Sequence, residues 1–289
     1  MQQFALKLVM LGFVLTSGMF SRTLAQDSKK PSTREVIYGH KDGLAMTFDF
    51  FEPSVEPNGS AVVFIVSGGW FSKYAPPEQM KFLLNPFLNA GYKGFAIRHG
   101  SSPKYSIKEA VADVRLAIRT IRHDAKEYGI DPEHIGVFGM SAGGHLTLML
   151  ATTGDDGDSK SQSSVAQTSS RIAAGVALVP PSDLTGYIWS TPNLDRQYRQ
   201  FPGLDISKKE AEAVSPLFFV TKDDAPCLII SGGKDTLVPP EQGRWIHEKM
   251  DEVGVDNNYI VYEKSGHGLE RDMASAVTET LNWFNKHVK

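Results

Sequence analysis

Short runs of apolar residues alternate along the chain with longer segments in which apolar positions recur every three to four residues. The run at 61–66 (Ala-Val-Val-Phe-Ile-Val) is rich in β-branched residues and followed by glycines, which is typical of a strand buried on both faces. Similar short runs predict the other strands, at residues 36–38, 46–51, 93–98, 135–139, 173–179, 226–230 and 259–263.

Helical spacing is clearest at residues 107–128, which end at Gly129, a typical C-terminal helix signal. Two further helices are predicted at 142–152 and 274–287. Strands that alternate with helices favour a mostly parallel sheet with helices on both faces. The predicted fold class is therefore α/β, with one domain at residues 36–289 that follows a polar linker at 26–35.

Two segments depart from this alternation. Residues 154–170 are rich in serine and aspartate and cannot bury a core, so they predict a mobile surface loop. Residues 184–214 carry large aromatic side chains without clear periodicity. An insertion of this kind between two strands predicts a small cap over a pocket.

The first 25 residues have the pattern of a secretory signal peptide. Lys7 precedes an apolar run at 8–15, and the segment ends in Thr23-Leu24-Ala25, in which Thr23 and Ala25 are the small residues before Gln26. We expect cleavage near Ala25 and Gln26 and a secreted or periplasmic protein, whose N-terminal sequence would begin at Gln26. The alternative is a retained N-terminal anchor, but the run is much shorter than the ~20 residues of a membrane span, so no stable membrane insertion is expected.

Charge and cysteine content narrow the possible partners. The 30 basic and 33 acidic residues give a formal charge of −3, and the basic residues form no run, which argues against nucleic-acid binding. Cys227 is the single cysteine, which excludes an intramolecular disulfide and a cysteine-based metal site. Hydrophobic residues make up 41% of the chain, enough for one large core.

The sequence Gly139-Met140-Ser141-Ala142-Gly143 matches the pattern G-x-S-x-G. It lies between a predicted strand and a predicted helix, which is the context that a nucleophile elbow requires. Ser141 would then lie at a helix N-terminus, where backbone N–H groups favour developing negative charge. An ordinary glycine-rich turn is the alternative.

A serine nucleophile needs a base, and that base needs an acid to orient it. Asp235 follows the predicted strand at 226–230, and His267 follows the last predicted strand, in the order Ser, Asp, His that this kind of site uses. Both would lie at strand C-termini, where α/β sheets build their active sites. Ser141, Asp235 and His267 are thus predicted to form a catalytic triad. A turn aspartate and a loop histidine are the alternatives.

The segment Ser67-Gly68-Gly69-Trp70 follows the first long strand and predicts an oxyanion hole. The expected donors are the N–H groups of Gly69 and Ala142, with Trp70 as a further donor. The predicted substrate pocket consists of Trp70, Phe71, Tyr74 and His99, with packing in the core or a loop as the alternative. His145 is expected to be a core histidine.

These motifs resemble the esterase and lipase branch of the α/β-hydrolases, and most closely the compact bacterial group related to feruloyl and acetylxylan esterases. The resemblance extends from residues 36–53 (VIYGHKDGLAMTFDFFEP) through 128–146 (YGIDPEHIGVFGMSAGGHL) to 282–289 (NWFNKHVK). There are two departures. Ser67 stands where the family usually has the His of His-Gly-Gly, and Arg98-His99-Gly100 stands where Tyr-Arg-Leu is common.

The resemblance implies a serine carboxylic-ester hydrolase that works through an acyl-enzyme, with no metal and no cofactor. We expect short-chain, acetyl-type esters as substrates, either small molecules or glycan esters. A peptidase or amidase of the prolyl-oligopeptidase type, an acyltransferase or lyase, and a non-catalytic binding protein on the same fold are the alternatives.

Overall fold

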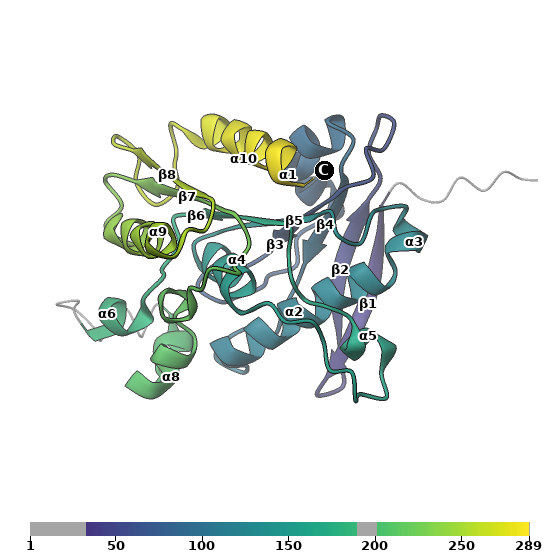
Figure 1. Cartoon of the computed structure of the whole chain (residues 1–289), viewed down its shortest axis with the longest axis horizontal. Helices are drawn as coiled ribbons and strands as arrows, with labels where there is room; N and C mark the ends of the chain where they lie inside the picture. Colours follow the sequence, from purple (N-terminus) through teal and green to yellow (C-terminus); the bar gives the residue numbers. More distant parts are fainter. Residues whose placement is uncertain (1–32, 190–200, 289) are drawn as a thin grey trace, which may run out of the picture. The chain divides into compact units, whose positions relative to one another are not determined.

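The structure, a computed structural model, describes residues 33–189 and 201–288. Its centre is an eight-stranded sheet in the order β1-β2-β4-β3-β5-β6-β7-β8 (Figure 1). Strand β2 pairs antiparallel with β1 and β4, and all later pairs in this order, from β4-β3 to β7-β8, are parallel. The strands are β1 (Thr33–Lys41), β2 (Leu44–Phe51), β3 (Ala61–Ile65), β4 (Lys93–Ile97), β5 (Ile135–Met140), β6 (Ala174–Leu178), β7 (Cys227–Gly232) and β8 (Asn257–Tyr262).

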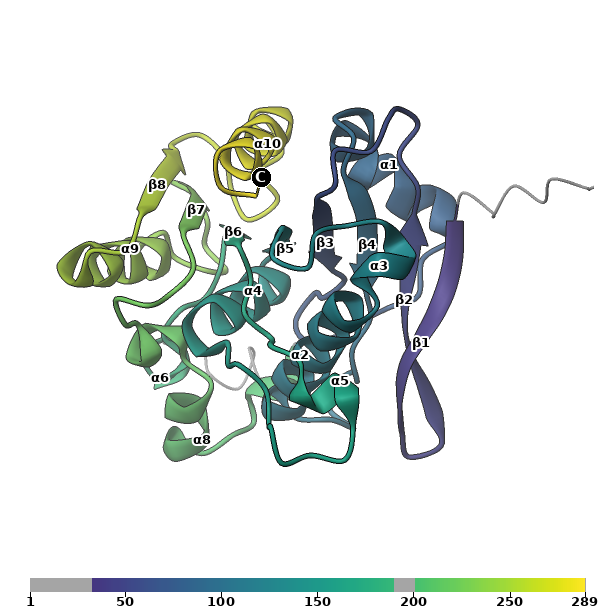
Figure 2. The ribbon, with the colours of Figure 1, turned by 45° about the vertical axis from the view of Figure 1, so that its right-hand side comes forward.

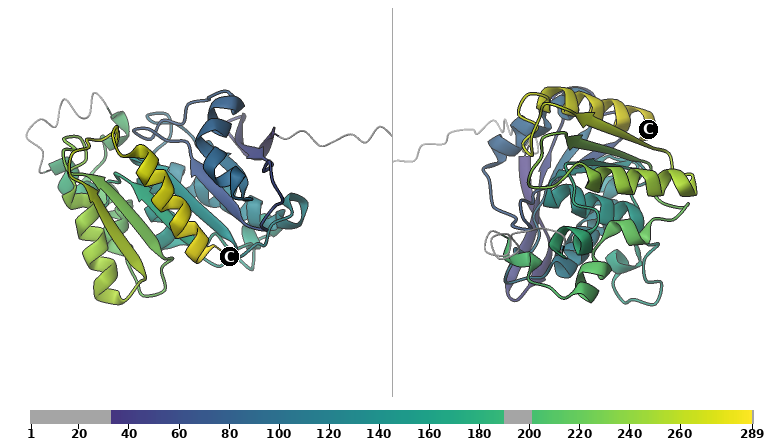
Figure 3. Two further views of the ribbon diagram at one scale, coloured as in Figure 1. Left: turned by 90° about the horizontal axis from the view of Figure 1, so that it is seen from above. Right: turned by 90° about the vertical axis from the view of Figure 1, so that its left-hand side faces the viewer.

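Helices cover both faces of this sheet, which confirms the predicted α/β-hydrolase fold. One face carries α1 (Pro77–Asn89) and α10 (Met273–His287), and the other carries α2 (Ile107–His123), α4 (Ala142–Thr153) and α9 (Glu241–Val253) (Figure 2). The right-hand view of Figure 3 shows α9 and α10 on opposite faces.

The apolar runs of the central strands are continuous because each strand faces two cores. On β5, Phe138 packs between helices α1 and α10, with its ring 5.1 Å from that of Phe87 and 6.4 Å from that of Phe284. The preceding Val137 points into the core on the other face, which α2 and α4 cover. Alternate side chains therefore enter opposite cores, and neither set can be polar.

The domain begins earlier than expected. Strand β1 starts at Thr33, so residues 33–35 of the predicted linker belong to the sheet. Thr33 pairs with Phe51 of β2, and the guanidinium of Arg34 lies 5.3 Å from the ring centre of Phe50 and 5.2 Å from that of Tyr128. The first three residues of β1 are polar and are held by these long-range contacts, so no apolar run marks the start of the strand in the sequence. The predicted signal peptide at 1–25 lies outside the described residues and stays a prediction.

Helix boundaries differ from expectation at several places. The helix predicted at 107–128 is divided at Asp124 into α2 and the short α3 (Ala125–Tyr128), while Gly129, at φ 65°, provides the expected left-handed C-cap. Helices α1 and α9 were not predicted. Helix α1 contains Pro86, which normally argues against a helix interior, and α9 is mostly polar.

The serine-rich segment 154–170 was expected to be mobile, but it is attached to α2 by hydrogen bonds. Arg122 donates to the carbonyl of Ser169 at 2.7 Å, and Arg119 donates to Asp155 and to the carbonyl of Thr168. The segment also includes the one-turn helix α5 (Ser164–Gln167).

The predicted cap at 184–214 is described in part, because residues 190–200 lie outside the description. Its described portions are α6 (Leu184–Trp189), the 3₁₀ turn η1 (Pro202–Leu204) and α8 (Lys208–Ala213).

Candidate active site

Ser141 lies in a sharp turn between β5 and α4, with φ 56° and ψ −120°. A non-glycine residue rarely adopts this conformation, which is typical of strained functional sites. The flanking glycines allow it. A Cβ on Gly139 would lie 2.4 Å from the carbonyl carbon of Gly143, and one on Gly143 would lie 2.8 Å from the oxygen of Ile65. The G-x-S-x-G pattern is therefore a steric requirement of this turn.

The structure brings the three predicted triad residues together. The Ser141 Oγ lies 2.8 Å from His267 Nε2, and His267 Nδ1 lies 2.7 Å from Asp235 Oδ2. The other oxygen of the buried Asp235 carboxylate accepts hydrogen bonds from the amides of Leu237 and Val238, both at 2.9 Å. Since a carboxylate only accepts, Nδ1 carries the imidazole proton, and Nε2 is left to accept the proton of the Ser141 hydroxyl.

Two loops that are distant in the sequence set the distance between acid and base. Asp235 follows β7 and His267 follows β8, and the loops touch at Gly232, where a Cβ would lie 2.3 Å from the oxygen of Gly266. The amide of Lys234 also donates to the carbonyl of Ser265 at 2.9 Å. The glycines in both loops allow this close backbone approach.

Glu270 is a residue at this site that the sequence analysis missed. Its carboxylate accepts hydrogen bonds from the amides of Gly266, at 3.3 Å, and Gly268, at 3.2 Å, on either side of His267. Hydrogen bonds from its own amide and from that of Gly266 lower the pKa of the Glu270 carboxyl. Glu270 thus holds the backbone of the histidine loop. A carboxylate three residues after a histidine between two glycines was the available signal.

The loop after β3, residues 67–71 and here called the glycine loop, forms a tight hairpin turn. Gly69 and Trp70 have φ values of 56° and 61°, and the amides of Gly68 and Phe71 each donate to the other residue's carbonyl at 2.9 Å. Positive φ at both central residues is the pattern of a type I′ turn. In the part of the chain that the structure describes, no backbone hydrogen bond is made by the N–H groups of Gly69, Trp70 or Ala142. These are the three predicted oxyanion donors.

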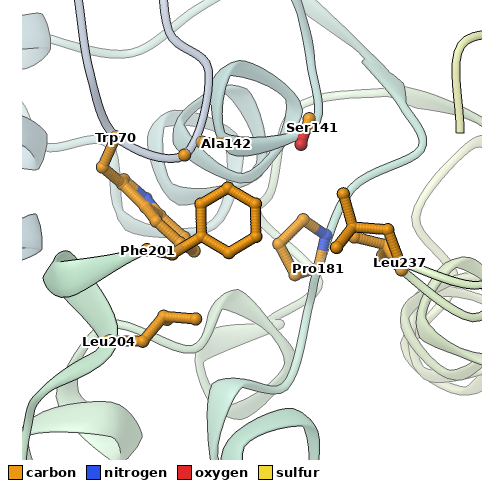
Figure 4. A pocket seen from close by; sticks show the side chains of 9 residues that line it. Trp70, Ser141, Ala142, Pro181, Phe201, Leu204 and Leu237 are labelled. Carbon is orange, nitrogen blue, oxygen red and sulfur yellow. The ribbon is translucent and has the colours of Figure 1, made fainter. Parts of the chain in front are cut away.

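A small cavity of about 20 Å³ adjoins Ser141 (Figure 4). Ser141, Ala142, Gly69 and Trp70 form part of its wall. The rest comes from segments that are distant in the sequence: Pro181, Phe201, Leu204, Leu237 and Val238. Phe201 closes it from the cap, so near to the loop that a Cβ on Gly69 would lie 2.4 Å from its ring. Phe201 and Leu204 are thus the residues of the predicted cap, 184–214, that line the cavity.

Of the four predicted pocket residues, only Trp70 lines this cavity. Phe71, Tyr74 and His99 line a separate, larger cavity of about 760 Å³, here called the groove. Trp70 and Phe71 are neighbours at the end of the tight turn, and their side chains line different cavities. The prediction that these three side chains share a pocket with Trp70 was wrong for this reason.

His145 is fully buried one turn into α4, as expected for a core residue. Its Nδ1 accepts from the indole N–H of Trp70 at 3.2 Å, and its Nε2 donates to the carbonyl of Val214 at 2.6 Å. It thereby links the glycine loop to the end of the cap. Burial lowers the pKa of His145 to about 4.

The buried His145 should make the protein less stable in acid. Between its folded pKa of about 4 and the ordinary value of 6.5, the unfolded chain binds more protons than the folded one, so stability falls as the pH falls. The expected loss from this residue between pH 7.5 and pH 5 is about 2 kcal/mol. Burial lowers the pKa of His99 too, which acts in the same direction.

Urea unfolding of wild type and His145→Asn at both pH values measures this effect. The variant should be less stable at pH 7.5 but should lose less stability on acidification. An equal loss in the two proteins would remove His145 as the cause.

Within residues 33–189 and 201–288, no group of three or more His, Cys, Asp or Glu side chains is placed to hold a metal ion. None of the described helices is long and apolar enough to cross a membrane.

Proteins named as esterases are among those to which this chain is similar. The chain is 27% identical over 226 residues to the probable carboxylic ester hydrolase LipM of Mycobacterium tuberculosis, an alignment that covers 76% of this chain and 52% of LipM. The chain thus spans about half the length of that relative.

Two solved structures are similar over most of both chains. A truncated carbohydrate esterase from gut microbiota has 25% identity and a TM-score of 0.73, covering 88% of this chain and 95% of the other. Butyrate-bound esterase Est2 of Thermogutta terrifontis has 26% identity and a TM-score of 0.70, covering 89% and 93%. The BD-FAE family profile matches residues 48–250, which include the elbow, the glycine loop and Asp235. The chain belongs to the BD-FAE family of α/β-hydrolases.

Proposed function

We propose that this protein is a serine carboxylic-ester hydrolase that acts through an acyl-enzyme on short-chain, acetyl-type esters of carbohydrates. The observation that carries the proposal is the chain of hydrogen bonds from Ser141 through His267 to Asp235, at 2.8 and 2.7 Å. Membership of the BD-FAE family and similarity to proteins named as esterases support it.

In the proposed reaction, His267 Nε2 takes the proton of the Ser141 hydroxyl while Oγ attacks the carbonyl carbon of the ester. The negative oxygen of the tetrahedral intermediate faces the N–H groups of Ala142, Gly69 and Trp70, and Asp235 stabilises the imidazolium. The C–O bond to the alcohol breaks, and His267 returns its proton to that oxygen. Water then attacks the acyl-enzyme by the same steps, releases the carboxylic acid and restores the Ser141 hydroxyl.

The size of the cavity beside Ser141 supports a small acyl group. About 20 Å³ holds little more than one water-sized group, which suits the methyl of an acetyl ester. Longer chains would meet the rings of Trp70 and Phe201.

The groove supports a bulky, polar alcohol. Its wall includes Phe71, and we propose that the alcohol part of the substrate lies in the groove while the acyl group lies beside Ser141. Its wall includes the ring of Tyr74, which is 66% exposed and lies 5.5 Å from the guanidinium of Arg98. Glu35 and Lys104 add charged hydrogen-bonding groups. A flat aromatic surface with polar neighbours suits a sugar ring.

A panel of p-nitrophenyl esters from acetyl to decanoyl tests the acyl preference. Wild type should prefer acetyl, and Phe201→Ala should shift the optimum to butyryl or longer, because one methylene in such a pocket changes binding by about 1–3 kcal/mol. Phe218→Ala, which removes an exposed ring outside the cavity, is the control and should keep the acetyl preference. A kcat/KM that rises steadily to decanoyl in wild type would contradict the proposal.

Acetylated xylo-oligosaccharides and a prolyl anilide separate the remaining alternatives. Release of acetate with no release of aniline supports the proposal. Efficient cleavage of the anilide would favour the peptidase alternative, and no turnover of any ester would favour the non-catalytic binding protein.

A further inference from the structure

The glycine loop needs external support to keep its amides in place. It contains two successive residues in the left-handed region, and the second of them, Trp70, is not a glycine. A bulky residue does not favour this conformation by itself. Oxyanion donors are effective only if they are held in position before the reaction. The contacts that hold this loop therefore bear directly on the proposed activity.

One such contact joins Ser67, at the start of the loop, to His99, which follows β4. The Ser67 Oγ lies 2.8 Å from His99 Nε2, and His99 Nδ1 lies 2.9 Å from the carbonyl oxygen of Gly100. Since a carbonyl only accepts, Nδ1 carries the proton of the imidazole, so Nε2 accepts and the Ser67 hydroxyl donates. His99 is 4% exposed, and burial lowers its pKa, which keeps it in the neutral form that can accept.

Other hydrogen bonds fasten the same two segments to each other. The Ser72 hydroxyl donates to the carbonyl of Val66 at 2.6 Å and accepts from the amide of His99 at 3.1 Å. The amide of Ser102 donates to the carbonyl of Trp70 at 3.1 Å. The loop is thus attached to the segment after β4 at its base and at its tip, and the Ser67–His99 pair adds a hydrogen bond between two side chains.

Both partners lie where the sequence differs from the pattern of the family that it resembles. Ser67 replaces the histidine of His-Gly-Gly, and His99 belongs to the tripeptide that replaces Tyr-Arg-Leu. We propose that His99 is a positioning residue that anchors the glycine loop through Ser67. This inference rests on the proposed esterase function.

A double-mutant cycle tests the pair. His99→Ala and Ser67→Ala should each lower kcat for p-nitrophenyl acetate by about 10–100-fold, less than the ~10²–10³-fold typical of losing one oxyanion donor outright. KM should stay within about twofold. Because each change breaks the same link, the double variant should be no slower than the slower single variant.

Rescue and control variants separate positioning from general damage. Ser67→Thr keeps the hydroxyl and His99→Gln keeps an acceptor, so both should recover most of kcat. Tyr38→Phe is the control, because it removes a buried hydrogen bond of 2.6 Å to the carbonyl of Arg98, next to His99, without touching the loop. Its kcat should match that of wild type.

The outcomes separate this inference from the proposed function. If wild type hydrolyses no ester and a fluorophosphonate does not label it, the proposed function itself has failed. If wild type is active, the inference is overturned by single variants that keep wild-type kcat, by losses that add in the double variant, or by a change in KM alone. Should His99→Ala fail to fold, the pair Ser67→Ala and Ser67→Thr decides the matter, since both keep His99.

Discussion

Ser141→Ala should lower kcat on p-nitrophenyl acetate by about 10⁴–10⁶-fold and leave the protein folded. The hydroxyl is the only group removed, and among residues 33–189 and 201–288 its one hydrogen bond is to His267 Nε2 at 2.8 Å. Alanine retains the Cβ, so the turn at φ 56° keeps its shape. Steady-state kinetics and a thermal melt measure the two effects. A fluorophosphonate should label wild type at Ser141 and leave the variant unlabelled.

Ser141→Gly provides a matched second variant. It should be as inactive as Ser141→Ala but more stable, because glycine adopts a positive φ without steric cost. If Ser141→Ala retains more than a few per cent of wild-type turnover, Ser141 is not the nucleophile.

Asp235→Asn should lower kcat by about 10⁴-fold with little change in the fold. One carboxylate oxygen accepts from the amides of Leu237 and Val238, and the asparagine carbonyl can keep both bonds. Its NH₂ would then face His267 Nδ1, which lies 2.7 Å from the other oxygen. Because an NH₂ group donates, Nδ1 would have to accept, and the imidazole proton would move to Nε2. His267 could then no longer take the proton of Ser141.

Asp183→Asn is the control for this change. Asp183 Oδ1 also accepts from two amides, those of Thr185 at 2.8 Å and Gly186 at 3.0 Å, but Asp183 contacts no imidazole. It should retain activity within a few-fold. Equal losses in the two variants would show that loop capping, and not the orientation of His267, explains the effect of Asp235.

The sequence alone determined which segments along the chain form the strands and which residues form the triad. Strands such as β5 send side chains into two cores, so their apolar runs can be recognised without knowledge of their neighbours. Ser141, Asp235 and His267 each follow a strand and have glycines nearby, and the parallel sheet brings strand ends to one edge. These signals are local, since each depends on a few consecutive residues.

Tertiary structure alone decided the shape of the pocket. Phe201 comes from the cap, Pro181 from the segment after β6 and Leu237 from the segment after β7, and no spacing in the sequence relates them. The sequence grouped Phe71 with Trp70 because they are adjacent, whereas the turn sends them into different cavities.

Tertiary structure alone also decided which side chains contact each other across the sheet. Ser67 and His99 appeared in the sequence as two separate departures from a family pattern, and only the pairing of β3 with β4 places one against the other. Local periodicity reports whether a side chain is buried or exposed. Which partner it meets depends on how the chain folds back on itself, and that is settled by packing over the whole sheet.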